Sequence, residues 1–313
     1  MNTKNRLNMR ERMMLIVSCL AMGVGLCSCS SDDDSAPNPL ADDGRAMRQL
    51  TITDASAVST RVAINADTYA ATWETGDEAT YFNLSNPWYG TLTATPTGSP
   101  MGASASLSGN VYCMKGDYLA VIYPNVGTIE QPSGNDPYFT IALSGQKGTL
   151  EDIGKHYHYV YGVSEVTSVE GNTASGTISN TKGLLSLCKF TFKKDATPVS
   201  VKTLKIGYGT NGAAGYPQTG QVSMPLTDVV DNVHVEADAP TGTPLTISLP
   251  DANPNPTGVV YVALFPGGYY DTQYGDGRLV FHFTVSDGTN TYTGTKKAVL
   301  KEGNYYAVDI AVN

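Results

Sequence analysis

The sequence predicts an all-β protein, because its composition and its patterning agree. Gly, Thr, Tyr, Val and Asn are abundant, whereas Lys and Glu are few. Apolar and polar residues alternate with a period of two over short runs, and long helical periodicity is nearly absent. Gly, Pro, Asn and Asp interrupt these runs, as turns between antiparallel strands do. We therefore expect two successive antiparallel β-sandwich domains.

The strands expected in the first half begin with residues 49–53 and 60–64, which alternate in polarity. Trp73 then precedes Thr75-Gly76-Asp77, a turn that lets the chain reverse into a strand ending at Phe82. The further strands expected here are 103–107, 110–114 after a tight turn at Ser108-Gly109-Asn110, 118–124 before a proline, 139–143 and 156–161.

The second half is expected to repeat this organisation. Its apolar run 261–266, which ends in an aromatic residue and a proline, resembles 118–124. Asp287-Gly288-Thr289-Asn290 is the turn of a hairpin. The expected strands are 184–192, 201–206, 245–249, 259–266, 278–285, 291–295 and 305–312. We predict a signal segment at 1–28, a flexible acidic tether at 29–48, and domains at 49–180 and 181–313, with the boundary in the polar stretch 171–182.

The start of the chain has the layout of a secretory signal, in which basic residues (Lys4, Arg6, Arg10 and Arg12) precede an apolar run at 13–26. The run is too short to span a membrane as a helix. It ends Leu26-Cys27-Ser28-Cys29, which resembles the lipobox of bacterial lipoproteins. That resemblance implies cutting before Cys29 and attachment of lipid to its sulfur. The alternative is an ordinary cleaved signal with incidental cysteines.

An acidic run, Ser30-Ser31-Asp32-Asp33-Asp34, follows the predicted lipid site. It resembles the export tag of Bacteroides-type surface lipoproteins, which implies an outer-membrane, surface-exposed location; the alternative is a solvated linker. The signal contains four of the 20 basic and one of the 29 acidic residues, which leaves 16 and 28 and a net charge of −12. This charge disfavours nucleic acid and anionic membrane as partners, so membrane attachment is expected through lipid on Cys29.

Two cysteines remain after this assignment, Cys113 and Cys188. An exported protein meets oxidising conditions, under which they could form a disulfide. Each also lies in an apolar run, where a buried free cysteine behaves as a small hydrophobic residue. Sequence position alone does not fix the geometry that a disulfide requires, so a disulfide and two buried free thiols both remain possible interpretations.

The motifs of catalysis are weak, and we predict neither an enzyme nor a cofactor. Residues 207–212 match G-x-G-x-x-G, but no helix follows to bind a pyrophosphate. His156 and His158 would share one face of a strand, yet no third metal ligand follows at a recognisable spacing. Neither a serine elbow nor a Cys–His cue is present. A hydrolase with an unfamiliar site is a weaker alternative.

Several segments, taken in order, resemble the fimbrillin family of pilin-like lipoproteins of Bacteroidetes. They are 59–61 before 73–77, 118–124, 141–146, 184–192 and 303–309. The resemblance implies two transthyretin-like β-sandwich domains and assembly into fimbriae by exchange of β-strands between subunits. It also implies that a protease cuts after an arginine that follows the first strand, and Arg61 matches that position. The alternative for Arg61 is an ordinary exposed side chain.

One departure from the family bears on assembly. Polymerising members carry an extra donor strand after their last domain strand, whereas this sequence stops at Asn313, directly after the strand expected at 305–312. We therefore expect a subunit that accepts a strand but does not supply one. Such a subunit would lie at a fibre tip, or, if never cut, would be a base or a stand-alone surface protein.

The sequence thus predicts a structural and adhesive fimbrial subunit, accessory or at the tip. Its expected partners are other fimbrial subunits, membrane lipid and a host or bacterial surface receptor. The alternative is a surface glycan-binding lipoprotein of a polysaccharide-uptake system, because Trp88-Tyr89, Tyr269-Tyr270 and Tyr274 lie near Gly and Pro and could stack on sugar rings. These aromatic residues could equally plug the ends of the sandwiches.

Overall fold

The structure is a computed structural model of the whole chain. It describes residues 44–54, 63–64, 71–97, 101–209, 212–250, 255–267 and 279–313. The predictions made for Cys29, Arg61 and the tyrosines at 269–274 lie outside these residues. The all-β prediction is confirmed, because most of the described residues lie in strands and very few lie in helices.

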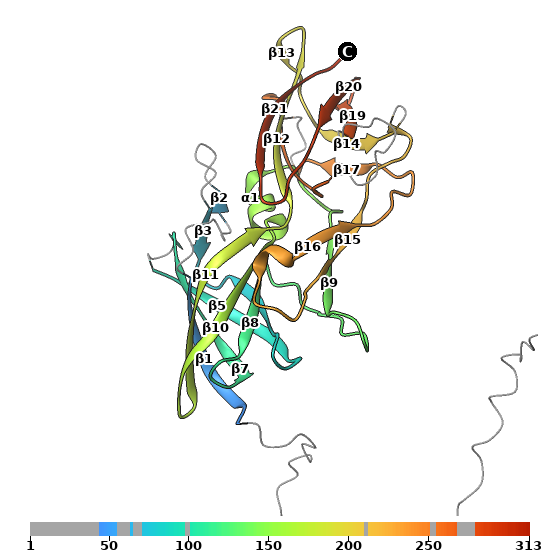
Figure 1. Cartoon of the computed structure of the whole chain (residues 1–313). Helices are drawn as coiled ribbons and strands as arrows, with labels where there is room; N and C mark the ends of the chain where they lie inside the picture. The colour runs from blue at the N-terminus through green and yellow to red at the C-terminus, as the bar shows by residue number, and fades with distance from the viewer. Residues whose placement is uncertain are drawn as a thin grey trace, which may run out of the picture. The chain divides into compact units, whose positions relative to one another are not determined.

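Seven strands form a closed ring in the order β1-β11-β10-β8-β4-β5-β7, with β7 returning to β1. They are β1 (Ala46–Asp54), β4 (Glu78–Asn83), β5 (Tyr89–Pro96), β7 (Ala105–Cys113), β8 (Tyr118–Tyr123), β10 (Val160–Glu170) and β11 (Thr173–Gly183). Figure 1 shows β1 in blue beside β7 and β11. The two sheets expected in this half are joined into one ring, because β1 pairs along both of its edges.

The second half forms two four-stranded sheets. In the first, β12 (Ser186–Lys194) pairs with β13 (Thr197–Pro198), β18 (Val259–Leu264) and β21 (Tyr305–Ala311). The second has the order β17 (Leu245–Ser248), β14 (Thr203–Tyr208), β19 (Leu279–Ser286) and β20 (Thr291–Ala298).

A third sheet takes strands from both halves of the sequence. In it, β15 (Thr219–Ser223) lies between β9 (Tyr138–Ala142) and β16 (His234–Ala237). The remaining elements are short: β2 (Ala63–Ile64), β3 (Ala71–Glu74), β6 (Met101–Gly102), α1 (Leu150–Asp152), a π-helix (Ile153–Tyr157) and a 3-10 helix (Val230–Asn232). Among the described residues we find no helix long and apolar enough to cross a membrane.

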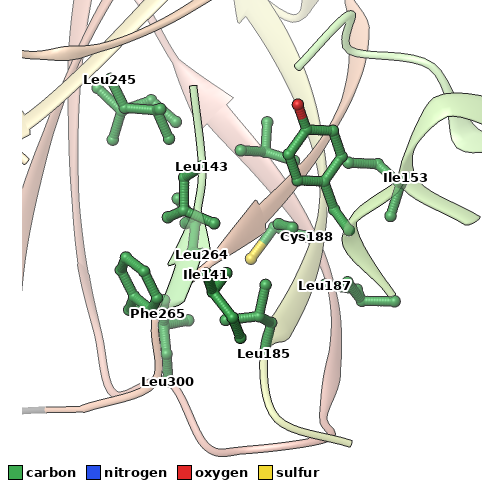
Figure 2. Packing of buried hydrophobic residues seen from close by; sticks show 14 of the residues in the cluster. Ile141, Leu143, Ile153, Leu185, Leu187, Cys188, Leu245, Leu264, Phe265 and Leu300 are labelled. Carbon is green, nitrogen blue, oxygen red and sulfur yellow. The ribbon is translucent and has the colours of Figure 1, made fainter. Parts of the chain in front are cut away.

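Two hydrophobic clusters make up the core. The smaller takes alternate side chains from the ring strands and fills the ring, with Trp73 added from β3. The larger combines the opposite face of β4, β8 and β10 with the sheets of the second half. Figure 2 shows part of it, with Ile141 and Leu143 near Leu185 and Leu264. The predicted domain boundary near residue 180 stays a prediction, because this shared cluster contains residues from both sides of it.

The polar stretch expected at the boundary is a strand of the ring, β11, and not a linker. Its inward positions alternate in the pattern Ala174, Gly176, Ile178, and all three are buried. Its outward positions are mostly Thr and Ser, which gave the stretch its polar composition. Gly176 is required by close packing, because a Cβ there would lie 2.5 Å from the Glu165 carbonyl oxygen of β10.

The tight turn expected at Ser108-Gly109-Asn110 is wrong, because β7 continues straight through it. A glycine is needed at position 109 for close packing between strands and not for a turn. A Cβ on Gly109 would lie 2.6 Å from the Thr91 carbonyl oxygen and 3.1 Å from Leu92 Cδ2 on β5. The glycine therefore lets β5 approach β7 closely.

The strand expected at 156–161 is also displaced. His156 lies in the π-helix, where its Nδ1 is 3.1 Å from Asp152 Oδ1, and the strand β10 starts at Val160. His156 and His158 therefore do not share a strand face. Asp152 also caps the local turn, since it accepts a hydrogen bond from the Lys147 N–H at 2.8 Å.

We predict that Gly109→Ala destabilises the protein by about 1–2 kcal/mol, because the new methyl group must displace the backbone of β5. Urea denaturation measures the change in the free energy of unfolding. Ser108→Ala, one residue earlier on the same strand, is the matched control and should change stability little. Equal stability of the two variants would contradict the close approach.

Candidate functional site

The site with the most distinctive geometry is the position of β1, which is hydrogen-bonded along both edges. Its register with β7 is antiparallel from Ala46↔Cys113 to Thr53↔Ser106. Its register with β11 is parallel from Gln49↔Thr173 to Asp54↔Ile178. Removing β1 would leave two neighbouring strands with unpaired N–H and C=O groups facing one another, a template for another extended chain.

The side chains of β1 fit the ring interior. Leu50 and Ile52 are fully buried, whereas Thr51 between them and Gln49 and Thr53 on either side are exposed. They belong to the same cluster as Leu107 and Val111 of β7, Val166 of β10, and Ala174 and Ile178 of β11. Burial of two such side chains contributes on the order of 3–6 kcal/mol. The space that β1 fills, which we call the β1 groove, therefore has apolar walls and backbone edges.

A buried carboxylate closes one end of the β1 groove. Asp117, in the turn between β7 and β8, is 1% exposed, and the Arg45 side chain that binds it is 12% exposed. Arg45 donates from Nη2 to Oδ1 at 2.7 Å and from Nε to Oδ2 at 2.9 Å, which is the two-pronged geometry of a strong guanidinium–carboxylate pair.

Neutral donors complete the surroundings of Asp117. The Asn83 side-chain amide donates at 2.9 Å and the Met114 N–H at 3.1 Å, both to Oδ2. Burial alone would raise the pKa of the Asp117 carboxyl, but the hydrogen bonds from Arg45, Asn83 and Met114 outweigh burial and lower the pKa. The group is therefore ionised at neutral pH, and it joins the start of β1 to the ends of β4 and β7.

The structure extends β1 beyond its predicted start. The strand begins at Ala46, three residues before Gln49, so it includes the last residues of the predicted tether. Arg48 lies within the strand, not before it, and its guanidinium donates to the carbonyl oxygens of Cys113 and Ala46. Sequence reasoning missed Arg45 and Asp117, because 72 residues separate them and neither belongs to a motif.

Arg61, the predicted processing residue, lies outside the described residues, as does the predicted lipid site Cys29. Their places in the chain are still informative. Arg61 falls between the end of β1 at Asp54 and the start of β2 at Ala63. A cut after Arg61 would therefore separate β1 from all later strands covalently while leaving its hydrogen bonds in place.

The two cysteines are free thiols in different clusters. Cys113 packs inside the ring, whereas Cys188 lies in the larger core near Leu187 and Ile153, as Figure 2 shows. Burial raises the pKa of Cys188 to about 12 and also raises that of Cys113. Both act as small hydrophobic residues, as one of the two open readings proposed.

The last strand, β21, has a place in its own sheet. It runs parallel to β12 from Leu187↔Tyr305 to Lys193↔Ala311. An ion pair joins Lys193 Nζ to Asp309 Oδ2 at 2.6 Å, and a bridge connects Gly294 to Val312. This strand is a component of the second half and not a free extension.

The described residues show no group of three or more His, Cys, Asp or Glu side chains placed to hold a metal ion. Of the G-x-G-x-x-G match, Gly207 and Tyr208 end β14, and the Gly212 N–H donates to the Gly209 carbonyl oxygen at 3.1 Å.

Among the aromatic residues expected in loops, Trp88 is 52% exposed and Tyr89 is 37% exposed. The ring of Trp88 lies 5.4 Å from that of Tyr112, with an interplanar angle of 42°. The two rings are tilted, so they do not make a flat platform.

No known protein-family profile matches the chain. No curated protein matches it either. Solved structures that are similar to this chain include a proposed cell adhesion protein from Bacteroides fragilis. The two share 11% sequence identity and a TM-score of 0.44, and the match covers 85% of this chain and 93% of that one. A second, from Bacteroides eggerthii, has 12% identity and a TM-score of 0.37 over 85% and 86%. The shaft pilin SpaA of Lactobacillus rhamnosus GG has 8% identity and a TM-score of 0.31 over 86% and 98%. At these values the similarities carry no functional argument.

We predict that Asp117→Asn destabilises the protein by on the order of 3 kcal/mol at pH 7, because a neutral amide replaces the buried carboxylate that the Arg45 guanidinium binds with two hydrogen bonds. The difference from the unsubstituted protein should be complete above the ordinary Asp pKa of 3.8 and shrink as the pH falls below it. The sign follows from the lowered pKa, since the ionised form stabilises the fold and is lost on protonation.

Urea denaturation between pH 2 and pH 7 provides the measurement. Asp309→Asn is the matched control, because its ion pair with Lys193 is exposed and such pairs contribute little. A difference between Asp117→Asn and the unsubstituted protein that stayed constant down to pH 2 would show that the carboxylate charge is unimportant.

Proposed function

We propose that this chain is a structural, adhesive subunit of a cell-surface fimbria of the fimbrillin type, and that β1 is the strand it gives up on assembly. The observation that carries the proposal is the double pairing of β1, the first described strand, directly ahead of the segment that contains Arg61. A single strand that is paired along both edges is an element that another extended chain can replace without any change in the rest of the ring.

The physics of replacement is that of β-augmentation. Loss of β1 exposes backbone groups on β7 and β11 together with the apolar wall around Leu107 and Ile178. The open groove favours a new strand, because that strand buries the apolar wall again and pairs the backbone groups of both neighbours. Backbone hydrogen bonds supply affinity, and alternate side chains filling the groove supply specificity.

In this proposal the chain accepts a strand and does not give up its last strand. The parallel pairing of β21 with β12 supports this assignment, because removing β21 would expose β12 in the same way. The strand that enters the β1 groove then comes from another subunit. An accessory or tip position in the fibre follows from this asymmetry.

Surface attachment in this proposal depends on lipid at Cys29. We predict that Cys29→Ala abolishes labelling of the protein by a fatty acid supplied to the producing cells, since the sulfur that carries the acyl group is removed. Cys19→Ala, also in the predicted signal, is the matched control and should leave labelling unchanged. Equal labelling of the Cys29→Ala and Cys19→Ala proteins would overturn the lipid assignment.

We predict that limited trypsin treatment of the folded protein cuts after Arg61 and that the cut protein then takes up a donor-strand peptide from a stalk subunit. Arg61→Ala should resist that cut and exclude the peptide, because β1 stays covalently attached. N-terminal sequencing identifies the cut, and fluorescence anisotropy measures uptake. A protein that is cut after Arg61 but takes up no donor strand would contradict strand exchange.

Exposure of Trp88 and Tyr89 supports a second candidate, a surface glycan-binding lipoprotein, because exposed aromatic rings stack on sugars. Glycan-array binding that is lost in Trp88→Ala would favour this candidate. The tilt between Trp88 and Tyr112 makes it the weaker of the two.

A further inference from the structure

The β1 groove carries a buried negative charge at one end, at Asp117. The cation that binds Asp117 is Arg45, the residue immediately before β1. The Asn83 amide and the Met114 N–H also bind it, and both are neutral. When β1 leaves the ring, Arg45 leaves with it, so the groove loses the positive charge that compensates Asp117.

A buried carboxylate without a cation is unfavourable, because neutral hydrogen bonds replace only part of its hydration. Asp117 is almost completely inaccessible, whereas the exposed pair Lys193–Asp309 can exchange protein contacts for water on both partners. The open groove is therefore selective in charge as well as in shape. A strand with apolar side chains alone would pack against the apolar walls of the β1 groove but would leave the negative charge of Asp117 without a cation.

We propose that the strand which replaces β1 must bring a basic side chain to Asp117, and that this requirement selects the partner subunit. The inference rests on the proposed strand exchange. The partner is an extended segment of another subunit with a basic residue level with Arg45 and apolar residues level with Leu50 and Ile52. Arginine fits better than lysine, because its planar guanidinium can bind both carboxylate oxygens at once, as Arg45 does.

The requirement excludes a candidate within this chain. The last strand, β21, has the sequence Tyr-Tyr-Ala-Val-Asp-Ile-Ala and contains neither Lys nor Arg. It carries an acidic residue, Asp309, which would repel Asp117 if placed near it. A second copy of this chain that offered β21 would therefore be a poor occupant of the β1 groove.

The test uses the purified protein with a recognition site for a specific protease placed in residues 55–61. Cutting the protein at this site makes β1 exchangeable. Fluorescent peptides of residues 44–54 compete for the groove, and anisotropy gives their affinities. The set comprises the native peptide, Arg45→Gln, Arg45→Lys and Arg48→Gln. The last is the matched control, because it removes one positive charge that binds carbonyl oxygens instead of Asp117.

We expect Arg45→Gln to bind at least about tenfold more weakly than the native peptide, with Arg45→Lys between them. In a receiver carrying Asp117→Asn, the native and Arg45→Gln peptides should differ by less than about twofold. The effect of Arg48→Gln should be the same in both receivers. This double-mutant comparison isolates the coupling between residues 45 and 117 from general effects on strand binding.

The possible results distinguish strand exchange itself from the requirement for a basic residue. If the native peptide does not enter the cut protein, strand exchange and the proposed function are wrong, and the partner requirement is wrong with them. If the native and Arg45→Gln peptides enter the unsubstituted receiver equally well, the charge requirement is overturned while strand exchange stands. Should the Asp117→Asn receiver not fold, the peptide series on the unsubstituted receiver decides by itself.

Discussion

The hydrogen bonds of β1 to two neighbours are the constraint on which the first half of the structure depends. β11 and β7 have no register with one another in the ring, and β1 joins them with parallel pairing on one edge and antiparallel pairing on the other. Because the ring closes only through this strand, the burial of Leu50 and Ile52 and the pairing of both neighbours are gained or lost together. Figure 1 shows β1, the first described strand, beside β11, the last strand of the ring in sequence order.

Period-two alternation of apolar and polar residues predicted strands well where one face of the strand is buried and the other is exposed to solvent. Residues 49–53, 118–124 and 305–312 each lie within or overlap a strand of the structure. The same criterion failed at β11, where small inward residues such as Ala174 and Gly176 give little apolar signal. It also failed at Gly109, because a glycine that permits close packing and a glycine that permits a turn look identical in one sequence.

Long-range pairing was beyond prediction for a different reason. The strand at 139–143 was expected, yet its partner is β15, some eighty positions later in the chain, and nothing local specifies that choice. Arg45 and Asp117 pose the same problem for the candidate site, since each is an ordinary charged residue until the fold brings them together. The sequence could therefore support the proposal that the first strand is exchanged, through the position of Arg61, but it could not predict that a replacement strand would need a basic residue.

The apolar walls of the β1 groove and the buried charge of Asp117 together determine the register of the strand that fills the groove. A slip of one residue would turn Leu50 and Ile52 outward and present polar residues to the core, so the apolar walls alone allow only even shifts. A shift of two residues would preserve that alternation but move the guanidinium away from Asp117 by about 6–7 Å, the rise of two strand residues. The walls thus fix which face of an incoming strand is buried, and the buried charge fixes its position along the groove. Two interactions of different physical origin specify one alignment, which an exchanged strand needs because no covalent connection to the ring holds it in place.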